Sequence, residues 1–180
     1  MSAFLKAPAP GFDDPLGLLG ACHGRIIERL DTLERLPPHL RRHGPDAQAQ
    51  LAARRILEYF DRAAPHHHAD EDRDFFPLLA AAEGRAGWDE GVPDLIARLA
   101  AEHPLLEQGW QALRASLEEV AGGRADAIGD AAGWIAATRA HLALEEERIL
   151  PLAARVLTPG ELEALGRAMA ARRGVDVAPG

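Results

Sequence analysis

Apolar residues recur at intervals of three and four along most of the chain, which is the period of an α-helix. The pattern predicts four long helical segments, at residues 15–36, 46–83, 91–120 and 125–157. We expect Pro37–Pro38 to end the first segment and Pro65 to kink or split the second, because proline removes a backbone donor and clashes with the preceding turn. No segment shows the alternation of apolar and polar positions that marks a β-strand.

The two ends of the chain differ from these segments. Residues 1–13 contain Pro8, Pro10 and Gly11 and are expected to form an extended arm. At the other end, the run from Thr158 to Glu161 supplies an N-cap, an early proline and a capping glutamate, which predicts a short last helix. We therefore predict one all-α domain, an up-down-up-down four-helix bundle over residues 14–157, with residues 158–180 forming a short C-terminal fifth helix and a tail.

Composition narrows the possible partners and compartments. The chain has 28 acidic and 20 basic residues among 180 and a net charge of -8, which argues against nucleic acid as a partner. No apolar run approaches the roughly 20 residues that span a bilayer, so we expect no membrane association. The single Cys22 cannot form an internal disulfide or a thiolate zinc site. We expect a cytoplasmic protein.

Histidines are distributed over the predicted bundle in an unusual way. Each long segment carries at least one, namely His23, one of the three at 66–68, His103 and His141. Two segments also share a pattern: HHADEDRDFFP and HLALEEERILP each place a glutamate four residues after a histidine and an apolar-apolar-proline tripeptide beyond it. Residues four apart project from the same helical face. The pairs His67–Glu71 and His141–Glu145 could therefore each hold one centre.

A single His-x-x-x-Glu pair is most often a solvated surface pair. The evidence for a common site is therefore that the pattern occurs twice. Glu71 and Glu145 facing each other inside a bundle would repel unless they were protonated or bound to a cation. The helix lengths support a common level for most ligands. The connection between the first and second helices fits poorly. His23 lies about 13 residues before the predicted end of its helix, whereas His67 lies about 21 residues after the start of the next helix.

The order and spacing of these motifs resemble the hemerythrin-like, or HHE cation-binding, family over residues 14–157. The resemblance implies a non-haem di-iron centre with two iron ions, an oxo or hydroxo bridge, terminal histidines and two bridging carboxylates. On this chain it implies that the bridges are Glu71 and Glu145 and that the terminal ligands are the histidines at 23, 67, 103 and 141.

One departure separates this chain from the oxygen-carrying members of that family, which have His-x-x-x-His on the third helix. Here the pattern is His103-Pro-Leu-Leu-Glu107. Glu107 is thus a candidate metal ligand, or else an exposed helix charge, and as a ligand it would favour the ferric state over reversible O2 binding. Glu146 is an alternative to Glu145 as the second bridge, because the oxygen carriers use that offset.

The ligand types and their number limit the metal and the chemistry. Imidazole and carboxylate suit iron, manganese or zinc, and six or seven candidate ligands are too many for one tetrahedral zinc, so two metals fit better. The leading expectation is a redox-active protein that responds to O2, NO or peroxide. The alternatives are reversible O2 carriage, enzymatic consumption of peroxide or O2, iron storage or donation without turnover, and a metal-free structural bundle. No catalytic side chain and no protein partner is indicated.

Overall fold

The computed structural model describes residues 10–176, and this part of the chain is helical with no β-strand. The long helices are α1 (Pro15–His43), α2 (Ala47–Asp70), α4 (Val92–Ala121) and α5 (Ala132–Leu144). Two π-helical turns, η1 (Glu71–Phe75) and η2 (Glu145–Ile149), lead into the short helices α3 (Phe76–Ala80) and α6 (Leu150–Val156), and α7 (Pro159–Arg172) follows. The all-α prediction is confirmed.

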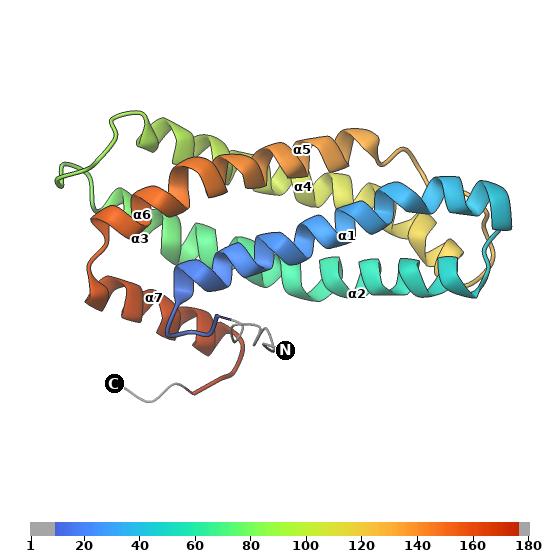
Figure 1. Cartoon of the computed structure of the whole chain (residues 1–180), viewed down its shortest axis with the longest axis horizontal. Helices are drawn as coiled ribbons and strands as arrows, with labels where there is room; N and C mark the ends of the chain where they lie inside the picture. The colour runs from blue at the N-terminus through green and yellow to red at the C-terminus, as the bar shows by residue number, and fades with distance from the viewer. Residues whose placement is uncertain (1–9, 177–180) are drawn as a thin grey trace, which may run out of the picture.

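The four long helices lie side by side, and α7 lies beside the end of the bundle where α1 begins, in contact with α1, α2 and η1 (Figure 1). In the packing order, α2 contacts α1 and α4, and α5 closes the ring by contacting α4 and α1. The predicted arm falls mostly on residues 1–9, which are outside the described residues. Within the described part, no helix is long and apolar enough to cross a membrane.

Two predicted boundaries were wrong, and of the two outcomes expected at Pro65 the split does not occur. Helix α1 does not end before Pro37–Pro38 but continues to His43, because the turn beyond the prolines buries Leu40 against the core. Helix α2 is not split at Pro65, and its first change of geometry comes at Glu71. The fourth helix begins at Ala132 rather than residue 125, after an irregular segment in which Gly129 donates to Ser116.

The extension of α1 removes the mismatch that the predicted boundaries left. His23 lies 20 residues before the end of α1, and His67 lies 20 residues after the start of α2. Both helices rise by the same amount per residue, so the two histidines reach the same level of the bundle. The connection between α1 and α2 therefore allows His23 and His67 to belong to one site.

Two apolar clusters fill the bundle, one on each side of a polar layer. On α1, Leu19 belongs to one cluster and Ile26 to the other, with the buried His23 between them. On α4, Leu99 of the first cluster and Trp110 of the second lie on either side of the buried His103. The polar layer is thus held between two dry regions, which fixes its side chains and limits access of water.

Helix α7 has the ends that its sequence predicts. The Thr158 hydroxyl accepts from the backbone N–H of Glu161, while the Glu161 carboxylate accepts from the backbone N–H of Thr158, which completes a capping box. Glu161 also receives two hydrogen bonds from Arg85, at 2.7 and 2.8 Å. The N-terminus of α7 is thereby tied to the loop after α3.

Candidate metal centre

Both copies of the repeated motif end in a widened helical turn. The backbone N–H of Phe76 donates to the carbonyl of Glu71, and that of Leu150 donates to Glu145, each a bond that spans five residues. Proline one residue further on, Pro77 in one copy, has no N–H and its ring crowds the carbonyl four residues before it. A π turn is a common geometry at functional sites. The apolar-apolar-proline tripeptide covers the end of the turn in both copies.

Four histidines and two glutamates from these helices meet in the polar layer, and each is at most 3% exposed. Glu71 lies between the histidines of two different groups. Its Oε1 is 3.3 Å from His67 Nε2 and 3.6 Å from His23 Nε2, whereas its Oε2 is 3.5 Å from His103 Nε2. One carboxylate therefore presents one oxygen to each side of the layer.

Glu145 has the matching arrangement from the opposite helix. Its Oε2 is 3.4 Å from His23 Nε2, and its Oε1 is 3.2 Å from His141 Nε2. The Nε2 atoms of His103 and His141 are 3.2 Å apart. The layer thus consists of two histidine pairs, His23 with His67 and His103 with His141, and both carboxylates extend from one pair to the other.

Two groups of atoms are close enough for a cation to contact all members of a group. One group contains His23, His67, Glu71 and Glu145, and the other contains His103, His141 and Glu145, with ligand atoms within 4.8 Å of one another. Several of these atoms are buried and have no hydrogen-bond partner within the described residues, including both imidazole nitrogens of His67 and both carboxylate oxygens of Glu145. Buried polar atoms are seldom left unpaired, so the donor set fits a metal.

Electrostatics supports the same conclusion. Burial raises the pKa of Glu71 well above its usual range, and the neighbouring Glu145 raises it further. Burial lowers the pKa of His67 well below its usual range, and the surrounding histidines add to this effect. Without a cation the layer therefore disfavours an ionised Glu71 and a protonated His67. A bound cation would reverse this by stabilising the ionised carboxylates next to neutral imidazoles.

Three of the four histidines are oriented by a second carboxylate. The Nδ1 atoms of His23, His103 and His141 lie 2.7, 2.8 and 2.9 Å from Glu146, Asp72 and Glu102, respectively. A carboxylate can only accept, so these contacts place the ring proton on Nδ1 and leave Nε2 free to face the layer. For His141, burial lowers the pKa, but the neighbouring carboxylates of Glu145 and Glu102 outweigh this effect, so the pKa is raised.

The sequence left open whether Glu146 replaces Glu145 in the layer and whether Glu107 reaches the layer. Glu145 is 1% exposed and lies in the layer, whereas the side chain of Glu146 is 47% exposed and reaches His23 from outside. Glu107 is not brought to the layer. It is exposed, and its Oε1 accepts from Gln111. The buried stripe of α4 runs through His103, Leu106 and Trp110, and Glu107 lies beside this stripe.

Sequence reasoning missed the orienting role of Glu102, Asp72 and Glu146. A local signal exists for two of them, because an acidic residue follows the glutamate of the layer in both motif copies. Each of these acids reaches a histidine on a neighbouring helix rather than on its own. Glu102 has no such signal, since its partner lies 39 residues away.

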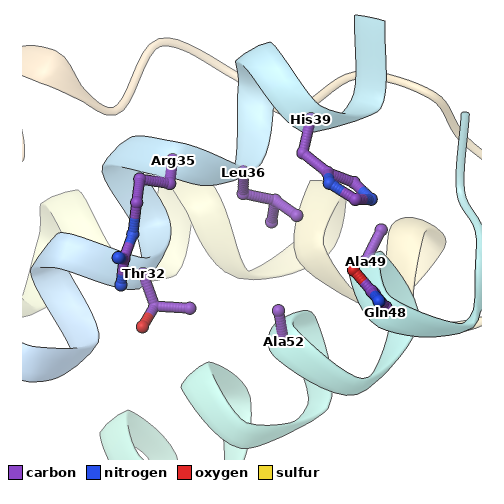
Figure 2. Close-up of a pocket in the computed structure, with 7 residues that line it drawn as sticks. All are labelled: Thr32, Arg35, Leu36, His39, Gln48, Ala49 and Ala52. Atoms are coloured by element: carbon purple, nitrogen blue, oxygen red, sulfur yellow. The ribbon is translucent and has the colours of Figure 1, made fainter. Parts of the chain in front are cut away.

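The other histidines lie outside the layer. His66 is exposed, whereas His68 is half-buried and stacks on His103 with ring centroids 4.3 Å apart. His39 Nε2 donates to the carboxylate of the N-cap residue Asp46 at 2.9 Å. It belongs to a surface pocket of about 280 Å³ near the far end of α1, which contains none of the six layer residues and is lined by Thr32, Arg35, Leu36, His39, Gln48, Ala49 and Ala52 (Figure 2).

A small, mostly apolar cavity adjoins the layer. Its volume is about 20 Å³, which is enough for one water-sized molecule. His141, His68 and Thr138 provide its polar edge, and Glu107 lies at its margin. The remaining lining residues are Ile26, Phe60, Ala64, Leu106, Trp110, Trp134 and Leu142.

The fold and the layer together define a helical-bundle protein with a buried histidine and carboxylate cluster able to bind metal. Comparison with known proteins gives the family. A family model described as the hemerythrin HHE cation binding domain matches residues 14–153. An uncharacterized protein of Haemophilus influenzae (strain ATCC 51907 / DSM 11121 / KW20 / Rd) is 33% identical over 168 residues, which cover 91% of this chain and 92% of that protein. The chain belongs to the hemerythrin HHE cation-binding family.

Proposed function

We propose that this protein holds two iron ions in the polar layer and is redox-active toward O2, NO or peroxide. The observation that carries the proposal is the position of Glu71 and Glu145, each of which presents one oxygen to the His23–His67 pair and the other to the His103–His141 pair. Two carboxylates placed between two histidine pairs suit two adjacent cations better than one.

The proposed ligands are His23, His67, His103, His141, Glu71 and Glu145. Each position would then have two imidazole nitrogens and two carboxylate oxygens, a set that suits iron and leaves positions open for a small molecule. Glu107 is left out because it is exposed. When bound, the iron pair would supply the electrons and the open positions for reaction with a small oxidant.

The chain itself supports such chemistry in three ways. Glu146, Asp72 and Glu102 hold three imidazoles with Nε2 directed inward. The apolar clusters on both sides exclude water, which strengthens the interaction of a cation with its ligands. The cavity beside His141 has room for a ligand of the size of O2 or NO next to the layer.

The compartment follows from the cysteine. Cys22 is buried and is the single cysteine of the sequence, so the fold uses no internal disulfide. A protein without disulfides and with a redox-active centre suits a reducing compartment, and we propose that it works in the cytoplasm.

The test combines metal analysis with spectroscopy. Protein purified without added metal is loaded with Fe²⁺ under anaerobic conditions, and its iron content and optical spectrum are measured before and after exposure to air, peroxide or NO. We expect two irons per chain and a near-ultraviolet band that forms on oxidation. One zinc per chain, with no uptake of iron, would overturn the proposal. Iron without any spectral response to the three oxidants would replace it with iron storage or donation.

A further inference from the structure

Another buried carboxylate, Asp70, immediately precedes the metal-facing Glu71. It is fully buried, and it is paired with two arginines near the C-terminal end of α7. Arg172 Nη1 lies 2.5 Å from its Oδ1, and Arg173 Nη2 lies 2.6 Å from its Oδ2. A charge in such a position is unfavourable unless it is paired and hydrogen-bonded, so the two arginines are what permit a carboxylate there.

Arg172 also contacts the far side of the same turn. Its Nη2 lies 2.5 Å from Oδ2 of Asp74, which belongs to η1. One planar guanidinium therefore connects Asp70 to Asp74, and Glu71 lies between them in the widened turn. The donors of a guanidinium form a rigid fork, so Arg172 limits how far these two residues can move relative to each other.

Helix α7 is itself anchored well enough to act as a support. Its Leu165 and Met169 are buried in the apolar cluster on that side of the layer. Gly166 packs so closely on the N-terminal segment that a Cβ there would meet the carbonyl oxygen of Phe12 at 1.9 Å. Arg173 adds a hydrogen bond to the carbonyl of Met169.

The second motif copy lacks this support. Leu144 and Arg148 occupy the positions that correspond to Asp70 and Asp74. Arg148 points to the loop before α4 and donates to Asp89. Helix α7 also lies beyond residues 14–153, which the family model matches. The arginines that pair with Asp70 and Asp74 are therefore an addition to the four-helix bundle.

We propose that Arg172 is a positioning residue that fixes the carboxylate of Glu71 by holding Asp70, just before η1, and Asp74, within η1. The inference rests on the proposed function, in which Glu71 is a metal ligand. It acts through backbone geometry, since Arg172 contacts the turn and not the layer itself.

The test uses the full chain with Arg172→Gln and, separately, Asp74→Asn. Both leave Asp70 paired with Arg173, so neither exposes a bare buried charge. Arg167→Gln is the matched control, because Arg167 lies on the same helix and pairs with the exposed Glu163. Amide hydrogen exchange of the metal-free protein is compared at residues 71–76 and 145–150. Affinity for Fe²⁺ is then measured anaerobically by competition with a chromophoric chelator.

We expect both variants to exchange faster at 71–76 but not at 145–150, and to bind Fe²⁺ about tenfold more weakly, whereas Arg167→Gln changes neither. Unchanged exchange at 71–76, or an equal increase in both turns, would overturn the inference. Faster exchange at 71–76 with wild-type affinity would also overturn it, because Arg172 would then serve the fold alone. Failure of the wild-type protein to bind iron would overturn the proposed function instead, while exchange would still show whether Arg172 holds the turn.

Discussion

The two copies of the repeated motif present the same face to the layer but are supported differently from behind. In the copy on α2 and η1, Asp70 and Asp74 are held by arginines of α7. In the copy on α5 and η2, the corresponding positions are Leu144, which packs against an apolar cluster, and Arg148 on the surface. Ionic bracing and apolar packing can therefore both hold a glutamate in a widened turn, which shows that the inward geometry does not depend on one kind of support.

The histidines of the two copies also differ. His141 Nδ1 is held by Glu102, whereas His67 Nδ1 has no hydrogen-bond partner among the described residues. Orientation of His67 is therefore left to packing, with its ring edge-on to His23 at 4.8 Å between centroids. The first copy thus lacks a hydrogen bond to its histidine. Its arginine contacts lie one turn later, on the residues beside its glutamate. Five predictions test this contrast.

The largest effect is expected from the carboxylates that the copies share. Glu71→Gln and Glu145→Gln should each reduce bound iron from the proposed pair to less than one ion per chain, because an amide supplies no negative charge between two cations. Iron analysis after anaerobic loading measures this, and the exposed Glu147→Gln is the control. Retention of the full iron content by either variant would mean that the carboxylate does not bridge.

Removal of one histidine, from either copy, should abolish metal binding without unfolding the protein. His67→Ala and His141→Ala should both lose stoichiometric iron while the circular dichroism stays helical. In the metal-free protein, His141→Ala should be less stable than His67→Ala by about 1 kcal/mol, because it alone loses a hydrogen bond to Glu102. Urea denaturation gives this difference, and equal stabilities would argue that the Glu102 contact contributes nothing.

The supports behind the glutamates predict unequal losses of stability. Asp70→Ala should lower the free energy of unfolding by about 3 kcal/mol, because it leaves the partly buried Arg173 without a carboxylate partner and Arg172 with Asp74 alone. Leu144→Ala, at the corresponding half-buried position, should cost about 1 kcal/mol. Both are measured on metal-free protein by urea denaturation. Similar losses would remove the contrast between the two copies.

The orienting carboxylates should have a smaller effect on metal binding than the bridges. Asp72→Asn, Glu102→Gln and Glu146→Gln should each weaken affinity for Fe²⁺ by about 10–100-fold while both ions still bind at saturation. Chelator competition measures the affinities. If Glu146→Gln instead emptied the site as Glu145→Gln is expected to do, the second bridge would lie one residue further along the chain.

The smallest effect concerns the other end of α7. Hydrogen bonds from Arg85, and then from Thr158, lower the pKa of Glu161 from its usual 4.5 to about 2. A lowered carboxyl pKa stabilises the fold above the unfolded value and loses that contribution as the pH falls toward 2. Glu161→Gln should therefore lower the Tm slightly at pH 7 and by less at pH 2.5. An equal shift at both pH values would mean that the charge of Glu161 is not the cause.

The sequence by itself determined the helices, their approximate level and the inward set of residues. Helical periodicity is local, and residues four apart share a face wherever the helix lies, so the pairs His67–Glu71 and His141–Glu145 could be recognised without a structure. In the structure those four residues are buried in one layer with His23 and His103. The capping box at Thr158 was equally local and was confirmed.

Only the tertiary structure decided which residues meet across helices. Glu145 and Glu146 are adjacent, and packing alone turns one inward and sends the other to the outside of His23. Glu107 stays exposed although it lies one turn after His103. Helix α1 continues past its two prolines because burial of residues beyond them compensates for the lost backbone bonds, a balance that involves other helices. The pairing of Asp70 with arginines about 100 residues later depends on where α7 docks, and no local pattern contains that information.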